Sequence, residues 1–329
     1  MKLLYAIQGT GNGHLSRAME IAHYLTKYAE VDFLLSGKAS ELPFPYPFKY
    51  KYHGLFFIFG NRGGPNYFES IKNFKPIRLL KDILSCPVKE YDYIINDFEP
   101  ISSWAAFRKK IPCIGVSHHS SFYSKLVPRP SKYNYFLEMG LAKFAPNTKR
   151  IGIHYKSYDK DIYPPIIRKE LIDAKVTDEG HITIYLPAFS DKLLIEHFRK
   201  IKNYIWKIFS KKTDHFYTKD NVEVYPINIE KYSKALLSAH AVILAAGFQA
   251  TSEAIFLKKK MLVIPMKNQY EQKCNAAALS QMGIKCIKRI DGGFSNMLLD
   301  WLINEPGIFI DMNVDNEKIA KRIIELIEE

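Results

Sequence analysis

The order in which apolar runs and helical segments follow one another is the feature of this sequence that most constrains its fold. Apolar runs of strand length alternate with stretches whose apolar residues recur at helical spacing. This alternation predicts parallel sheets with helices on both faces, because the crossover between parallel strands is usually a helix. The runs are "LLYAI", "VDFLLS", "YDYIIND", "IPCIGVS", "HITIYLP", "AVILAAG" and "MLVIPM".

The chain length and one loosened stretch predict two domains. A chain of 329 residues exceeds what a single hydrophobic core usually serves. The alternation loosens between residues 149 and 180, where Pro164 and Pro165 stand together and mark an interdomain connection. We therefore expect two doubly wound, Rossmann-like domains, over residues 1–160 and 161–312.

The last segment of the sequence, residues 313–329, predicts an amphipathic helix. Ile319, Ile323 and Ile327 recur at helical spacing. Asp315 precedes them and has the side chain of a helix cap.

Composition narrows the class of partner. The formal charge of +13 favours anionic partners, but its lysines are scattered and no nucleic-acid-binding module is recognisable. The four cysteines are widely spaced and include no Cys-x-x-Cys pair, so neither a zinc site nor a disulfide framework is indicated. No apolar segment is long enough for a spanning helix or a signal peptide, and we expect a cytoplasmic protein.

The stretch "LLYAIQGTGNGHLSRAMEIAHYL" places a glycine-rich turn between a strand and a helix. Gly11 and Gly13 let the backbone approach a ligand, and the helix that follows offers free N–H groups to an anion. A dinucleotide fingerprint is disfavoured, because its third glycine would fall on His14 and the next strand ends in Ser36 in place of an acid. The turn predicts a loop for a phosphate or other polar ligand that carries an imidazole. The plain alternative is a tight crossover.

A second informative stretch is "AVILAAGFQATSEAIF", where a strand ends, Gly247 makes a turn and a helix begins near Gln249. A diphosphate suits the free N–H groups of that helix. The Glu253 carboxylate has acceptors for two vicinal ribose hydroxyls. After the next strand come Gln269, Glu271 and Gln272, whose side chains suit sugar hydroxyls. Taken singly, each of these acids and amides could equally be a solvent-exposed helix residue.

Together these residues resemble the donor-binding region of GT-B glycosyltransferases, in particular the MurG-like enzymes and their relatives. The correspondence follows one order along the chain: Gly247, Ser252 with Glu253, Pro265, Gln272, and Asn275 with Ala276. It extends to the opening loop "GTGNGH" and, with less specificity, to "NDFEP" and "GVSHH".

The resemblance implies a GT-B fold, with two Rossmann-like domains facing across a cleft, and a nucleotide-sugar donor, UDP-linked in the related enzymes. It places the ribose on Glu253, the diphosphate on the turn formed by Gly247, Phe248, Gln249 and Ala250, the sugar on Glu271 and Gln272, and the base against Ile227 and Asn228. Two departures weaken the assignment of the donor: Phe248 replaces a second glycine, and the turn "LPAFSD" leaves Ser190 as its phosphate contact.

For the chemical step we expect His14 to act as general base, since imidazole titrates near neutrality. Asp97 and Glu99 come next, followed by His118 and His119. Lys267 or Lys273 would stabilise the departing diphosphate. We expect no metal, since no Asp-x-Asp tract follows a strand, and no cofactor beyond the co-substrate; inversion at the anomeric carbon is implied by the resemblance alone.

Two other functions are compatible with the same fold. A nucleotide-sugar 2-epimerase would need acids in the cleft, and Asp97 and Glu99 are available for that role. A non-catalytic nucleotide-sugar-binding protein would need none of the candidate bases. The acceptor is not specified by the sequence, so a glycan, a lipid-linked and a small-molecule acceptor all remain open.

One further stretch, residues 53–84, predicts peripheral contact with an anionic membrane surface. It mixes aromatic residues, Phe56, Phe57, Phe59 and Phe68, with basic ones, Lys72, Lys75, Arg78 and Lys81. The alternative is a core segment with a basic outer face.

Overall fold

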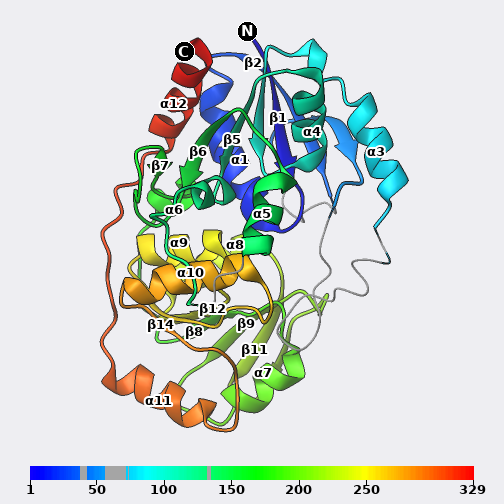
Figure 1. Ribbon diagram of the computed structural model, residues 1–329. Coiled ribbons are helices and arrows are strands. Elements are labelled where there is room, and N and C mark those ends of the chain that lie inside the picture. Colours follow the sequence, from blue (N-terminus) through cyan, green and yellow to red (C-terminus); the bar gives the residue numbers. More distant parts are fainter. Residues whose placement is uncertain (38–42, 56–71, 73, 132–134) are drawn as a thin grey trace.

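The computed structural model describes residues 1–37, 43–55, 72, 74–131 and 135–329. These residues form two α/β domains, which Figure 1 shows stacked one above the other. The aromatic residues of the predicted membrane-contact stretch, from Phe56 to Phe68, lie outside the described residues.

The first domain is built on a sheet in the order β3-β2-β1-β4-β5-β6-β7, in which every described pair of strands is parallel. The central strand β1 is buried along almost its whole length, as its continuous apolar run predicts. The strands are β1 (Lys2–Gln8), β2 (Glu30–Ser36), β3 (Phe48–Tyr52), β4 (Tyr93–Asp97), β5 (Cys113–Ser117), β6 (Lys149–Ile153) and β7 (Ile162–Tyr163); the α-helices are α1 (Asn12–Leu25), α3 (Pro76–Ser85), α4 (Pro100–Lys109) and α5 (Tyr135–Phe144), with short 3₁₀ turns at Val88–Glu90 and His119–Tyr123.

The second domain repeats this architecture, with the strand order β10-β11-β9-β8-β12-β13-β14. Its described strand pairs are parallel except for the edge pair β10 and β11. Its elements are β8 (Ile182–Tyr185), β9 (Trp206–Ser210), β10 (Tyr217–Lys219), β11 (Val222–Pro226), β12 (Ala241–Leu244), β13 (Lys260–Val263), β14 (Lys285–Cys286), α7 (Asp191–Phe198), α8 (Ile229–Ser238), α9 (Phe248–Phe256), α10 (Tyr270–Gln281) and α11 (Phe294–Asn304).

The chain passes between the domains twice. The first crossing follows β7 and Pro164, and leads through the short helix α6 (Lys169–Ile172) to β8. The second crossing consists of residues 305–315. Helix α12 (Asn316–Glu328) comes next and packs on the first domain, where it lies beside α1 in Figure 1. Asp315 caps α12 by accepting a hydrogen bond from Lys318 N, at 2.9 Å.

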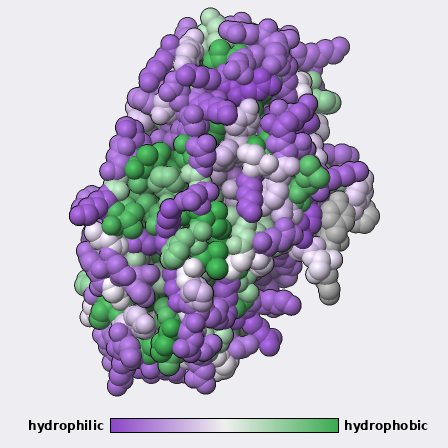
Figure 2. All heavy atoms as spheres, turned by 90° about the vertical axis from the view of Figure 1, so that its left-hand side faces the viewer, coloured by the Kyte–Doolittle hydropathy of each residue, from purple (hydrophilic) through white to green (hydrophobic). Residues whose placement is uncertain are grey.

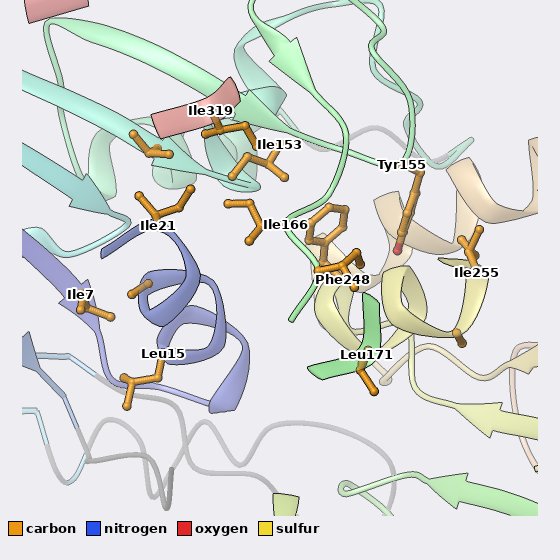
Figure 3. Close-up of a cluster of buried hydrophobic side chains, with 14 of the residues drawn as sticks. Ile7, Leu15, Ile21, Ile153, Tyr155, Ile166, Leu171, Phe248, Ile255 and Ile319 are labelled. Atoms are coloured by element: carbon orange, nitrogen blue, oxygen red, sulfur yellow. The ribbon is translucent and has the colours of Figure 1, made fainter. Parts of the chain in front are cut away.

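One hydrophobic core is continuous across the junction of the domains. Figure 3 shows Ile7, Leu15 and Ile21 of the first domain in the same cluster as Phe248 and Ile255 of the second. The α12 residue Ile319 belongs to this cluster as well. Because apolar burial stabilises by roughly 25 cal/mol per Å², this shared core holds the two sheets in a defined relation. The carboxyl ends of their strands therefore meet at one place.

The outer surface beside residues 305–315 is largely hydrophilic, with hydrophobic areas that gather mainly near its mid-height (Figure 2). Ile308 and Phe309 on this segment are exposed. Within the described residues, no helix combines the length and the apolar character that crossing a bilayer requires.

Candidate functional site

A cavity of about 630 Å³ lies where the strand ends of the two domains meet. The first domain contributes the β1–α1 loop, the ends of β4 and β5, and one face of α5. The second contributes the loops after β8, β9, β11, β12 and β13. Lining residues that were expected from the sequence are Gly11, Gly13, His14, His118, His119, Ile227, Asn228, Gly247, Phe248, Gln249, Ala250, Glu253, Gln269, Glu271 and Gln272.

The two glycines of the opening loop are required for different reasons. Gly11 has φ +88°, a left-handed conformation that side chains with a Cβ rarely adopt. At Gly13, an added Cβ would lie 3.2 Å from the Cβ of Gln249 in the other domain. Gly13 thus permits the close approach of α1 to α9.

His14 belongs to a buried polar triad. Its Nδ1 lies 2.9 Å from Asp97 Oδ1, and the Arg17 guanidinium donates to both oxygens of Asp97 at 3.0 and 3.1 Å. Asp97 is 0% exposed and does not line the cavity, so its role is to hold His14 rather than to meet a ligand. Because the Nδ1–H group donates a hydrogen bond to Asp97, Nε2 carries the lone pair of the neutral ring.

The electrostatics of the triad suit a base that is neutral at neutral pH. Burial lowers the pKa of His14, and Asp97 offsets part of that shift. Burial alone would raise the pKa of Asp97, but Arg17 and His14 outweigh it and hold this pKa below its ordinary value. Asp97 is therefore ionised and His14 unprotonated near pH 7.

Glu99 does not fit its predicted role as a base. Its carboxylate caps α4, where it accepts hydrogen bonds from the backbone N–H groups of Ile101 and Ser102, both at 2.7 Å, and from the Ser36 hydroxyl at 2.6 Å. It is 0% exposed and does not line the cavity. Burial raises the pKa of Glu99 despite these hydrogen bonds. The acidic residue that follows β4 in "NDFEP" is thus a structural cap.

Phe98, between those two acids, adopts a left-handed backbone conformation with φ +57°. A phenylalanine is rarely found there, and such strain clusters at functional sites. Its ring stacks between His119, at 3.5 Å between ring centroids, and Phe144, at 4.6 Å. With Leu137 and Leu141 of α5, it gives the first-domain side of the cavity an apolar wall.

On the opposite side, the turn at Gly247 opens onto the cavity. An added Cβ at Gly247 would meet nothing within 4 Å. The first turn of α9 has no side-chain cap, so its N–H groups are available to a ligand. Phe248, which replaces a glycine of the related enzymes, stacks on His118 with ring centroids 3.9 Å apart.

Glu253 lies in the cavity wall but is already engaged. Arg168 donates to its two oxygens at 2.8 and 2.9 Å, and Gln249 Nε2 donates to Oε1 at 3.0 Å. A carboxylate offers about four acceptor sites, so three bonds leave room for one ribose hydroxyl. A second hydroxyl would have to displace the Gln249 amide.

The N-terminal turn of α10 carries the three polar residues expected near the donor sugar. Gln269 caps the helix through Gln272 N, while the Gln272 side chain accepts a hydrogen bond from Met266 N at 2.8 Å. Glu271 Oε2 lies 3.1 Å from Gln269 Nε2 and 3.3 Å from His119 Nε2 of the first domain. Burial would raise the pKa of Glu271, but the neighbouring histidines outweigh it and lower that pKa.

Five other residues predicted to contact the donor lie away from the cavity lining. Ser190 caps α7 by accepting from Leu193 N. Ser252 is fully buried in α9, and Asn275 is fully buried in α10 between His118 and Ala246 O. Lys267 and Lys273, the two lysines proposed for the diphosphate, have exposed side chains that do not line the cavity.

Among the lining residues that sequence reasoning missed are Arg17, Arg168 and Phe98. Arg17 follows His14 by one helical turn, and this spacing could have indicated a pair. Arg168 lies beyond the proline pair. Phe98 lies between two acids, which are the more usual candidates for a catalytic role. Neither has a local signal for a place in the cavity, because Glu253, which Arg168 contacts there, and the ring partners of Phe98 are distant in sequence. The described residues contain no cluster of three potential metal ligands. That the activity needs no metal stays a prediction.

Two Rossmann-like domains with a loop-lined cavity at their facing strand ends define the GT-B class of glycosyltransferases. The chain belongs to glycosyl transferase family 1, whose pattern it matches over residues 1–299. A search of curated proteins finds no sequence match.

Solved structures show the same fold at low sequence identity. The spinosyn forosaminyltransferase SpnP superposes with a TM-score of 0.61 and 13% identity, over 100% of both chains. MurG of Acinetobacter baumannii gives 0.58 and 15%, over 100% of this chain and 99% of that one. A UDP-N-acetylglucosamine 2-epimerase gives 0.57 and 14%, over 99% and 95%. At these identities the likeness concerns the fold alone.

Proposed function

We propose that this protein transfers a sugar from a UDP-linked nucleotide sugar to an acceptor hydroxyl, with inversion and without a metal. One observation carries the proposal. The cavity has His14, held from behind by Asp97, on its first-domain side, and the open N-terminus of α9 with Glu253 on its second-domain side. A proton acceptor thus faces a site suited to a diphosphate and a ribose across one enclosed space.

The transfer step follows from this arrangement. The acceptor oxygen forms a bond with the anomeric carbon of the donor while its proton passes to His14 Nε2. The bond between that carbon and the diphosphate oxygen breaks, and its electron pair leaves with the diphosphate. The N–H groups of the first turn of α9 stabilise the charge that develops there. Asp97 stabilises the imidazolium that His14 becomes.

The apolar wall of the cavity indicates which kind of acceptor it would bind. Phe98, Leu137, Leu141 and Phe144 lie on the same side of the cavity as His14. An apolar molecule that carries the hydroxyl would gain roughly 25 cal/mol for each Å² that it buries there. Among the acceptors considered, this favours a small apolar molecule or a lipid-linked one over a glycan.

The epimerase alternative is less well supported. It needs acids that reach the sugar, and the two candidates of the first domain do not line the cavity. Asp97 is held by Arg17 and His14, and Glu99 caps α4. The fold likeness to a 2-epimerase carries no further weight, since it concerns the fold alone.

We also propose that α3 contacts an anionic membrane surface. Leu79 and Ile83 of this helix pack against the first-domain core, while Ile77, Leu80 and Leu84 face outward and are 73%, 54% and 48% exposed. The neighbouring basic residues, Lys75, Arg78 and Lys81, are exposed as well. A second apolar face flanked by cations suits a bilayer interface.

A thermal-shift titration with UDP-glucose, UDP-N-acetylglucosamine and UDP tests donor binding, because a ligand of the native state raises Tm by mass action. In Glu253→Gln we expect weaker binding, by roughly 1–3 kcal/mol for a lost acceptor. Acceptor-dependent release of UDP then separates a transferase from an epimerase. Donor binding without any such release in the presence of apolar alcohols and phenols would instead support the non-catalytic alternative.

A further inference from the structure

Two adjacent histidines, His118 and His119, directly follow strand β5, and both reach across the cleft to helix α10. His118 Nε2 lies 2.7 Å from Asn275 Oδ1, and His119 Nε2 lies 3.3 Å from Glu271 Oε2. Glu271 and Asn275 are four residues apart and therefore lie on one face of α10. The first domain thus contacts the helix that carries the expected sugar-binding residues.

These two contacts differ in their access to ligand. His118 is 1% exposed; its Nδ1 contacts Ile153 O at 2.9 Å, and burial lowers its pKa to about 4. It is a fixed, buried support for α10. His118 lines the cavity too, but its partner Asn275 does not. His119 and Glu271 both line it, so their contact lies where a donor sugar would bind.

The contacts on Glu271 fall on one oxygen. His119 Nε2 and Gln269 Nε2 both meet Oε2, and within the described residues Oε1 has no hydrogen-bond partner. His119 is held in turn by its stack against Phe98, with ring centroids 3.5 Å apart. The carboxylate of the second domain is therefore oriented by a residue of the first, and Oε1 is the oxygen left for a ligand hydroxyl.

We propose that His119 is a positioning residue for the donor sugar, acting through Glu271. The sugar-binding carboxylate is then correctly oriented only when the domains are closed, so recognition of the sugar depends on closure. Binding of the nucleotide part of the donor, which is held at α9 and Glu253, does not depend on closure. This inference rests on the proposed function, because it assumes that a nucleotide sugar occupies the cavity.

Two substitutions separate the hydrogen bond from the ring stack. His119→Phe retains a ring against Phe98 but removes the donor to Glu271, whereas His119→Gln retains an N–H donor without the ring. Affinities for UDP and UDP-glucose or UDP-N-acetylglucosamine are measured by calorimetry, with Glu271→Gln for comparison. Kinetic constants for the same donors are measured once an acceptor has been identified.

We expect His119→Phe to weaken binding of the UDP-sugar about tenfold, the usual cost of a hydrogen bond to a charged group, with UDP affinity unchanged. His119→Gln should restore most of the loss. The double variant His119→Phe/Glu271→Gln should be no worse than Glu271→Gln alone, because both changes remove the same interaction.

Three results would overturn the inference. Unchanged UDP-sugar affinity in His119→Phe would show that the contact does not position Glu271. A loss in His119→Gln but not in His119→Phe would assign the role to the ring stack. Equal losses for UDP and UDP-sugar in both variants would indicate a general change in the cleft. Failure of the wild type to bind any of these nucleotides would instead overturn the proposed function, and this inference with it.

Discussion

His14 is the residue on which the proposed transfer depends most directly. Replacing it with alanine should lower turnover by roughly 10²–10⁴-fold, the usual contribution of a positioned base, while donor affinity stays nearly intact. The reason is that His14 belongs to the first domain and the expected donor contacts to the second. Lost donor binding with preserved turnover at saturation would make the imidazole a phosphate ligand.

The pH dependence of the wild type gives a second measurement on His14. Its neutral form accepts the proton, so activity should be constant at neutral pH and fall as the pH drops through the pKa of His14. Burial places that pKa below the ordinary value, which is about 6.5. A rate profile of kcat/KM should therefore show its acid limb below pH 6.5. An acid limb above that value would exclude the buried His14 as the base.

Asp97 and Glu99 form a matched pair of buried acids with different roles. Asp97→Asn should lower kcat strongly, because the ring of His14 loses its orienting carboxylate. Glu99→Gln should lower Tm through the loss of a helix-capping carboxylate, at roughly 1–2 kcal/mol, with kcat of the folded protein unchanged. Steady-state rates and melting curves of both variants decide this. Equal kcat losses in the two would contradict the separate roles.

At this scale the sequence indicates residues but not their pairing. His14, Gly247 and Glu253 were identified because each stands in a local pattern at a strand end. Arg17 with Asp97 and Arg168 with Glu253 are contacts across 80 and 85 residues. No spacing rule indicates such contacts; only the packing of parallel strands brings them together.

At the scale of elements, the alternation of strands and helices was enough to predict both sheets, because buried parallel strands are continuous apolar runs. Strands β3, β6 and β9 were not anticipated, nor were the short edge strands β7, β10 and β14. An edge strand is half solvated and pairs on one side only, so its sequence carries little periodic signal. The capping roles of Glu99 and Ser190 were missed for a related reason: a cap and a ligand-binding residue occupy the same position at a strand-to-helix turn.

Helix α3 provides the prediction at this scale. Leu80→Glu places a charge on its exposed apolar face, and Lys81→Glu reverses one of the adjacent cations. Sedimentation with vesicles that contain anionic lipid should capture the wild type at low salt, less of it at high salt, and little of either variant. Asp32, in β2 and paired with Lys49, offers a control: Asp32→Asn should sediment like the wild type. Absence of wild-type binding at both salt concentrations would leave the helix without a membrane role.

At the scale of the whole molecule, the cavity depends on how closely the domains approach. The shared core, the return of α12 to the first domain and the contacts of β5 with α10 all fix that approach. The sequence predicted two domains from its length and from the loosened stretch at residues 149–180, and a facing cleft through resemblance to a known family. It did not indicate the contacts across the cleft, because each joins residues whose own neighbours along the chain give no reason for the pairing.

Gly13 tests the importance of this approach. In Gly13→Ala the new methyl group would lie 3.2 Å from the Cβ of Gln249, so α9 must move away from α1 at this contact by a few tenths of an ångström. Such a displacement should lower kcat, since a misplacement of about 1 Å can cost 10²-fold, and leave UDP affinity within about threefold. Gly292→Ala is the control, because its Cβ would meet nothing within 4 Å and the residue lies outside the cavity. Gly13→Ala should be slow at saturating donor while Gly292→Ala matches the wild type. Full activity in Gly13→Ala would mean that closure to this distance is not required for transfer.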